Sequence, residues 1–204
     1  MKTVALVSQK GGVGKTTLAT ALAVEAMNRG SSTLLLDLDP QASASFWMDN
    51  REDKQLAVTA TPASRLKHVL SAAQDAGAQH VFVDTPPFAK DIAFEAANVA
   101  DMVLIPTKPA VLDIIAMAKT VELIRSLGKT AAVVLTFCPF AGREIGEAEA
   151  AIKDLGVPLA PVRIGSRIAY SRAQQHGLTA QELEPDGKAA HEIQRLYEYM
   201  RIHI

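Results

Sequence analysis

The sequence has few of the features that mark secreted, metal-clustered or membrane-spanning proteins. Its 204 residues include one cysteine, Cys138, so neither an internal disulfide nor a CxxC metal site can form. No apolar run approaches the roughly 20 residues of a transmembrane helix, and the N-terminus carries no signal-peptide pattern. These absences predict a soluble cytoplasmic protein in which Cys138 is a small buried hydrophobe.

Aromatic residues and excess charge are also scarce. Aromatics make up 5% of the chain and hydrophobic residues 49%, which favours an alanine- and valine-rich α/β core. The formal net charge is −1, so any nucleic-acid binding has to come from a local basic patch. There are no internal repeats or low-complexity tracts. A chain of this length can fold alone, and we expect one domain over residues 1–204.

A glycine-rich loop near the N-terminus is the most informative stretch. It reads Lys10-Gly11-Gly12-Val13-Gly14-Lys15-Thr16-Thr17. A short apolar strand, residues 3–7, precedes it, and apolar residues at helical spacing follow it up to Gly30. Glycines let backbone N–H groups converge on an anion, and the new helix directs its positive end at the same point. The loop is therefore predicted to bind phosphate, with Lys15 on the β- and γ-phosphates and the Thr16 hydroxyl on Mg²⁺.

The loop departs from the standard phosphate-loop pattern in a specific way. Gln9 stands where the first glycine of G-x-x-x-x-G-K-[ST] belongs, and a second lysine, Lys10, opens the loop. This form resembles the deviant Walker A loop of the ParA/MinD family of ATPases. The resemblance implies that Lys10 reaches across a dimer interface to the phosphates bound by the partner subunit.

Two further strands are predicted to end in carboxylates. One is followed by Asp37-Leu38-Asp39-Pro40-Gln41, and the other by Asp84-Thr85-Pro86-Pro87. Ligands of open parallel sheets bind beyond the carboxyl ends of the strands, so these acids should face the nucleotide. The two stretches resemble the family's Walker A′ and Walker B motifs. The resemblance implies that Asp39 positions the attacking water, that Asp37 lies close to Mg²⁺ and that Asp84 holds the ion through a water.

Apolar strands alternate with helices along the rest of the chain. Strands are expected before Thr61 and at residues 33–36, 80–83, 102–105, 131–137 and 159–164. Helices are expected from a Thr61-Pro62 cap to Gly77, at residues 91–100, 113–127 and 143–155, and from Asp186 to the end. Near-continuous apolar strands that alternate with helices predict a doubly wound, mainly parallel sheet with helices on both faces. With the loop, this is an α/β P-loop NTPase fold of the deviant Walker A type.

The resemblance also locates the segments that respond to the nucleotide. It implies a first switch over residues 42–50 and a second one at Pro86, Pro87 and Phe88. We interpret the aromatic pair Phe46-Trp47 as core or interface packing. Thr136, at the end of a strand, is a candidate for contact with adenine.

A basic stretch lies near the C-terminus. Residues 163–181 contain Arg163, Arg167 and Arg172 but no acidic residue. The stretch resembles the segment that small plasmid-partition ParA proteins carry between their last strand and last helix. The resemblance implies non-specific DNA binding by these arginines when the dimer holds ATP, through sequence-independent phosphate contacts. The alternatives are a solvated surface and a place for Arg163 or Arg167 near the nucleotide.

The closing helix carries an apolar stripe at helical spacing, formed by Ile193, Leu196, Tyr197, Met200 and Ile204. A stripe of this kind either docks on the sheet or binds a membrane, as in MinD-like relatives. Its polar face mixes acidic and basic residues, so we expect docking on the sheet and no membrane binding.

The resemblance extends over essentially the whole chain and implies an ATP-dependent DNA-partitioning or cargo-positioning ATPase. The implied ligands are ATP and Mg²⁺. The implied partners are a second copy in an ATP-sandwich dimer, nucleoid DNA, and a small centromere-binding or cargo-adaptor protein that stimulates hydrolysis. Nothing before the first strand encodes a helix-turn-helix, so autonomous operator binding is not expected. Residues 10–17 should bind nucleotide, and Lys10, Lys15 and Asp39 should serve catalysis. The metal should lie among Thr16, Asp37, Asp39 and Asp84.

Three other classes share parts of this pattern. A MinD-like membrane-cycling ATPase has the same nucleotide motifs. A metabolic or electron-transfer enzyme of the superfamily, such as dethiobiotin synthetase or nitrogenase iron protein, needs a substrate pocket or paired cluster cysteines, and one cysteine cannot supply a pair. A non-catalytic scaffold would bind ATP without stimulated turnover.

Overall fold

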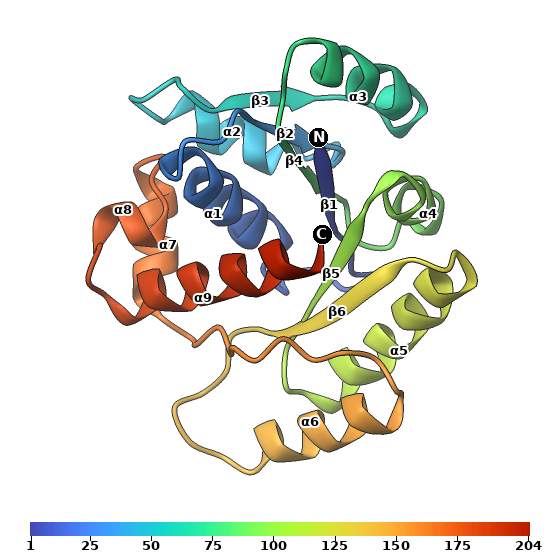
Figure 1. Cartoon of the computed structure of the whole chain (residues 1–204). Coiled ribbons are helices and arrows are strands. Elements are labelled where there is room, and N and C mark those ends of the chain that lie inside the picture. Colours follow the sequence, from blue (N-terminus) through green and yellow to red (C-terminus); the bar gives the residue numbers. More distant parts are fainter.

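Six parallel strands form the centre of the computed structural model, which describes residues 1–204 throughout (Figure 1). The strands are β1 (Lys2–Leu6), β2 (Thr33–Asp37), β3 (Ala57–Ala60), β4 (His80–Asp84), β5 (Met102–Thr107) and β6 (Thr130–Leu135). Their order is β3-β2-β4-β1-β5-β6, and every neighbouring pair is parallel. From β1 the chain runs to β2 and β3 on one side, returns to β4 beside β1, and then crosses to β5 and β6 on the other side. The crevice beyond the carboxyl end of β1, where the direction changes, is where such a sheet binds its ligand. The predicted fold class is confirmed.

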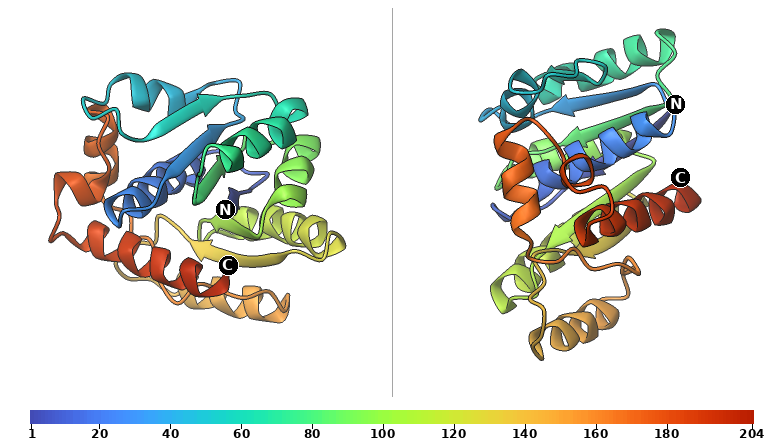
Figure 2. Two further views of the ribbon diagram at one scale, coloured as in Figure 1. Left: turned by 45° about the horizontal axis from the view of Figure 1, so that its top comes forward. Right: turned by 90° about the vertical axis from the view of Figure 1, so that its left-hand side faces the viewer.

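Helices cover both faces of the sheet (Figures 1 and 2). The first face carries α1 (Lys15–Asn28), α2 (Ser43–Asp49), α7 (Ile168–Gln175), α8 (Ala180–Leu183) and α9 (Lys188–His203). The second face carries α3 (Leu66–Asp75), α4 (Lys90–Val99), α5 (Val111–Ser126) and α6 (Glu144–Asp154). Successive residues of a strand point to opposite faces, so Val4 and Leu6 pack in the first core while Ala5 and Val7 pack in the second. Because both cores are apolar, the central strands lack a polar face.

The expected strand at residues 159–164 is not formed, which corrects the sequence-based assignment. The segment meets β6 and the residues after it through two isolated parallel bridges, Val133 with Leu159 and Cys138 with Gly165, and through one hydrogen bond from the Ile164 N–H to the Leu135 carbonyl. Pro158 and Pro161 lie in this segment. Proline has no N–H to donate to a ladder, so the chain follows the edge of β6 without becoming a seventh strand.

Three short helices and one helix start also differ from the sequence-based assignment. Helices α2, α7 and α8 are absent from it, because a helix of four to eight residues contains too few turns to show a clear apolar period. Pro62 does not open the helix that follows it. Its backbone is extended, with φ −69° and ψ 148°, and a 3₁₀ turn over Ala63–Arg65 leads into α3 at Leu66.

The apolar stripe of α9 is turned into the first core. Ile193, Leu196, Tyr197 and Met200 are at most 2% exposed. The helix lies beside α1 (Figure 1), and the Arg29 guanidinium stacks over the Tyr197 ring. The predicted docking of this helix is therefore confirmed. No helix of the structure has the length and apolar character needed to cross a bilayer.

This docking predicts an unequal response to two alanine substitutions in α9. Leu196→Ala should lower the free energy of unfolding by about 2–5 kcal/mol, because it leaves a cavity under a fully buried side chain. Ile202→Ala should change it by no more than about 0.5 kcal/mol, because Ile202 is 73% exposed. Urea unfolding followed by circular dichroism measures both. Equal effects would contradict the docked position of the helix.

Candidate nucleotide-binding site

The loop between β1 and α1 has the backbone of an anion-binding turn. Gly12 and Gly14 have φ of +67° and +89°, a region that side-chain-bearing residues rarely adopt. A Cβ on Gly14 would also lie 3.2 Å from the Phe137 ring. Helix α1 starts at Lys15 without a side-chain cap, which leaves its first N–H groups for a ligand.

The two lysines of the loop have different surroundings. Lys15 is 7% exposed, and its Nζ donates to the carbonyl oxygen of Lys10 at 3.0 Å. Burial lowers the pKa of Lys15, and the charges of Asp84 and Asp39 act in the opposite direction. The ammonium of Lys10 makes no hydrogen bond or ion pair within the chain. Only the backbone N–H and carbonyl of this residue are hydrogen-bonded. Lys15 is therefore held inside the site, whereas Lys10 is available to a group from outside.

Thr16 and Asp84 connect the loop to the neighbouring strand β4. The Thr16 hydroxyl donates to Oδ2 of Asp84 at 2.6 Å. Asp84 is fully buried, and its Oδ1 has no hydrogen-bond partner. Burial raises the pKa of Asp84 to about 7, although the Thr16 hydrogen bond opposes the shift. An unpaired buried carboxylate oxygen is costly, so this atom is suited to a cation or to a water that the cation holds.

The carboxylates fit a magnesium ion that is shared with a phosphate. No three His, Cys, Asp or Glu side chains come together as a metal cluster. Mg²⁺ usually binds proteins through one or two carboxylates and completes its shell with waters and substrate phosphates. The Thr16 hydroxyl and the unpaired Asp84 oxygen, beside an anion-binding turn, match that pattern.

Asp37 lies beside this group but is engaged differently. Its Oδ2 accepts from the backbone N–H groups of Ala44 and Ser45 at 3.0 and 3.1 Å, and its Oδ1 accepts from the N–H of Asp39 at 3.0 Å. It thereby fixes the start of α2 and the turn that carries Asp39. Metal contact by Asp37 stays a prediction, and the structure gives this residue a positioning role in addition.

A cavity of about 700 Å³ opens above the loop, and Asp39 lines it. Residues from segments far along the chain also line it, namely Ser43, Phe46, Phe137, Ser171, Gln174 and Gln175. Sequence reasoning did not find the three polar residues of α7. Glutamine and serine follow no recognisable spacing there, so only the tertiary structure shows that they reach the site.

Thr136, the candidate adenine contact, lies buried beneath the loop, and its contact with adenine stays a prediction. This residue is 1% exposed, and its hydroxyl donates to the Val13 carbonyl at 2.9 Å. It therefore braces the loop from beneath. The next residue, Phe137, lines the cavity instead. Its backbone is left-handed, with φ 49°, and the Lys108 ammonium lies 5.0 Å from its ring centroid.

Helix α7 is hydrogen-bonded directly to the phosphate-loop helix. The side-chain amide of Gln174 donates to the Thr17 hydroxyl at 3.0 Å. Thr17 is part of the predicted phosphate loop, and Gln174 belongs to the acid-free stretch that opens at Arg163. The basic stretch is thus in contact with the nucleotide site through one polar pair.

A second attachment joins α2 to the chain just after α7. The indole N–H of Trp47 donates to the Leu178 carbonyl at 2.9 Å, and Arg51 donates to the Gly177 carbonyl at 3.1 Å. The guanidinium of Arg51 also pairs with Glu182 and is 2% exposed. A Cβ on Gly177 would lie 2.5 Å from the backbone of Arg51, so the two segments fit only with glycine there.

The three arginines of the basic stretch lie in different environments. Arg163 pairs with Glu149 at 2.6 Å, and Arg167 donates to Glu192 at 2.9 Å. Arg172 is exposed in the last turn of α7 and has no ion pair. Their role in DNA binding stays a prediction. The structure adds that two of the three are paired with acids of other elements.

Comparison with known proteins decides the family. The family model described as the CobQ/CobB/MinD/ParA nucleotide binding domain matches residues 4–180. The chain belongs to this family. Its predicted resemblance to the ParA/MinD ATPases is confirmed, and the roles of the loop, Thr16 and Asp84 in nucleotide binding stay predictions.

Relatives of the family cover almost the whole chain. A maintenance of carboxysome distribution protein A from Gloeobacter kilaueensis is 34% identical over 96% of this chain and 90% of its own length. A protein ParA from Rhizobium radiobacter is 27% identical over 87% of this chain and 84% of its own length. The solved structure of a Cyanothece McdA variant in complex with ATP matches with a TM-score of 0.84 at 20% identity, over 98% of this chain and 96% of that chain. This last likeness confirms the fold.

The burial of Asp84 predicts a pH-dependent stability. The folded ligand-free protein holds a proton on Asp84 that the unfolded chain releases, so stability should fall as pH rises from about 4 to 7. Asp84→Asn removes this cost. We expect it to raise the melting temperature of the ligand-free protein at about pH 8, with a gain that shrinks towards pH 4. One pKa unit corresponds to about 1.4 kcal/mol, so the gain is several kcal/mol at most. A gain that is independent of pH in thermal melts would contradict this.

Proposed function

We propose that this protein is an ATPase that dimerises around two ATP molecules, binds DNA without sequence preference and thereby positions a cargo. The observation that carries the proposal is the loop itself. A buried Lys15, a Thr16–Asp84 pair with one unpaired oxygen, and a second lysine without a partner in its own chain meet at one anion turn. Family membership supports the hydrolysis of ATP.

The chemistry is electrostatic. The N–H groups of the loop and Lys15 would hold the β- and γ-phosphates, and Lys10 of the second copy would add charge where it develops on the γ-phosphoryl. Asp39, which lines the cavity, would orient the attacking water. Thr16 and Asp84 would hold Mg²⁺, which supplies charge neutralisation at the phosphates when it is bound.

Exposed apolar side chains near the site support a dimer. Phe88 is 78% exposed beside Gly11, and Phe46 is 69% exposed at the rim of the cavity. Large apolar groups gathered beside a ligand site favour a protein partner over bulk water. A second copy placed there would also bring its own loop lysine to the phosphates.

The contacts of α7 provide a route from nucleotide to DNA. Gln174 touches Thr17 of the loop, and Arg172 projects from the same helix. The segment after α7 is bonded to α2, which Asp37 positions. Changes at the phosphates would therefore shift the helix that carries Arg172. This supports DNA binding that depends on ATP.

The proposal leaves two kinds of cargo to be distinguished. The relatives are named for carboxysome distribution and for ParA, so a protein assembly and a plasmid or chromosome are both candidate cargoes. A MinD-like membrane cycle is less well supported, because the apolar stripe of α9 is buried against the sheet. We expect a cytoplasmic, nucleoid-associated protein with a small adaptor that stimulates hydrolysis.

Two substitutions separate binding from hydrolysis. Lys15→Ala should abolish nucleotide binding or turnover, because it removes the buried cation of the loop. Asp39→Ala should bind ATP and dimerise but hydrolyse it slowly, because the water loses its orienting carboxylate. Filter binding, light scattering and phosphate release measure the three properties. Rapid turnover by Asp39→Ala would contradict the role given to Asp39.

The DNA part of the proposal is tested by co-sedimentation with mixed-sequence duplex in ATP, ADP or no nucleotide. Binding should require ATP. If the dimer makes about six phosphate contacts, affinity should fall roughly 10³-fold between about 50 and 200 mM salt. Binding that ignores salt, or that is equal in all nucleotide states, would contradict the proposal. Intact turnover without DNA binding would favour a membrane- or protein-templated relative.

A further inference from the structure

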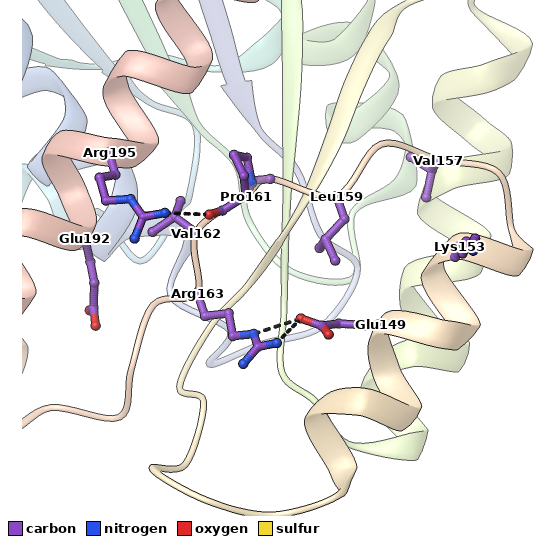
Figure 3. A pocket seen from close by; sticks show the side chains of 10 residues that line it. Glu149, Lys153, Val157, Leu159, Pro161, Val162, Arg163, Glu192 and Arg195 are labelled. Carbon is purple, nitrogen blue, oxygen red and sulfur yellow. Dashed lines mark hydrogen bonds and ion pairs between the residues drawn. The ribbon is translucent and has the colours of Figure 1, made fainter.

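A groove with a volume of about 760 Å³ lies away from the candidate nucleotide site (Figure 3). Three elements form it: helix α6, the segment 157–163 along the edge of β6, and helix α9. Figure 3 shows Lys153 on α6, Arg163 in the middle of the groove and Arg195 on α9. One basic side chain thus comes from each element.

The basic side chains in the groove are not balanced by free acids. Lys153 and Arg195 are exposed and have no carboxylate within 4.0 Å, and Arg195 donates only to the Pro161 carbonyl, at 3.0 Å. Arg163 is 53% exposed and is held by Glu149. Two cations of the groove, Lys153 and Arg195, are therefore unpaired, and the third, Arg163, is in an ion pair that is exposed to solvent.

The second acid at the groove, Glu192, is fully engaged elsewhere. Its carboxylate accepts hydrogen bonds from Arg167, from the Tyr170 hydroxyl at 3.0 Å and from the Gly165 N–H at 3.1 Å. These bonds hold the start of the basic stretch to α9. Glu192 is thus a structural part of the wall, and Glu149 is the one carboxylate at the groove that can give up its partner.

We propose that this groove binds the sugar-phosphate backbone of DNA, with Lys153 and Arg195 as contacts in addition to Arg163, and with Glu149 as an internal competitor that occupies Arg163 until a phosphate replaces it. This inference rests on the proposed DNA binding and assigns part of its interface. It commits to DNA over an acidic peptide for one reason. The chain leaves the groove at Arg163 into the acid-free residues 163–181, where Arg172 is exposed and has no ion pair, so the same segment carries a further cation for a long polyanion.

The exchange at Arg163 is physically inexpensive. The Arg163–Glu149 pair is exposed on both sides, at 53% and 32%, and pairs of this kind are worth little in water. A phosphate offers the same bidentate geometry to a guanidinium as a carboxylate does. Binding can therefore replace one pair by another without leaving a buried charge unpaired.

The test uses the full-length protein with ATP and a fluorescein-labelled mixed-sequence duplex, followed by anisotropy across a salt series. Lys153→Gln and Arg195→Gln should each weaken binding. Each should also reduce the slope of log affinity against log salt by about two per dimer, because each removes one phosphate contact per subunit. Glu149→Gln should tighten binding by about two- to fivefold per subunit, since an exposed pair holds Arg163 no more strongly than that.

Two matched controls separate local from general charge effects. Glu147→Gln makes the same change on the same helix, but Glu147 pairs with Arg143 and does not line the groove. Lys67→Gln removes an exposed lysine from α3, on the other face of the sheet from α9. Both should leave the salt slope unchanged. Thermal melting and basal ATP turnover should be unchanged in all five variants.

Each outcome of this test has a distinct meaning. Wild-type binding that needs ATP, with no effect of the three groove substitutions, would overturn this inference and leave the proposed function in place. Effects of Glu149→Gln and Glu147→Gln of equal size would overturn the competitor role of Glu149. Groove substitutions that alter binding of labelled poly-glutamate but not of DNA would assign the groove to an acidic peptide instead. No DNA binding by the wild type in any nucleotide state would overturn both the inference and the proposed interface.

Discussion

One constraint shapes the site: the fold buries a carboxylate there and leaves one of its oxygens without a hydrogen-bond partner. Asp84 ends β4 with one oxygen unpaired, and its other oxygen accepts a hydrogen bond from Thr16 in the first turn of α1. The first N–H groups of this helix have no side-chain cap. The unpaired carboxylate oxygen is costly in a ligand-free protein, whereas the uncapped N–H groups border the open cavity. A magnesium–phosphate complex bound here would pair with both, because it would bring a cation to the carboxylate and anionic oxygens to the helix. On the proposed function, stability and nucleotide affinity would then depend on the same few atoms.

The sheet order makes this convergence possible. Because β1 lies between β4 and β5, the loop after β1 adjoins the carboxyl end of β4, and β2 on the far side of β4 brings Asp37 and Asp39 to the same edge. Asp37 then fixes α2, and α2 is bonded to the chain beyond α7. Hydrogen bonds thus connect the strand ends at the candidate site to the C-terminal helices, although Trp47 and Leu178 are 131 residues apart in the sequence.

The net charge of the chain is close to zero, but acidic and basic side chains lie in different parts of the structure. The acids Asp37 and Asp84 are buried beneath the candidate site, whereas Arg163, Arg172 and Arg195 are exposed on the C-terminal segments. Some of the arginines are paired with acids of other elements, and others are not. A positive surface can therefore exist locally on a chain of net charge −1, and its strength depends on which pairs open.

Local spacing along the chain was enough to predict the fold class, the glycine-rich anion turn and the acids at the strand ends, because glycine, lysine and aspartate act within a few residues of one strand end. The contacts between segments that are distant in the sequence could be seen only in the folded chain. There, Thr136 braces the loop while Phe137 lines the cavity, and Gln174 reaches Thr17. Glu149 likewise holds Arg163. These contacts join residues that are far apart in the chain, and no period in the sequence predicts which of them come together.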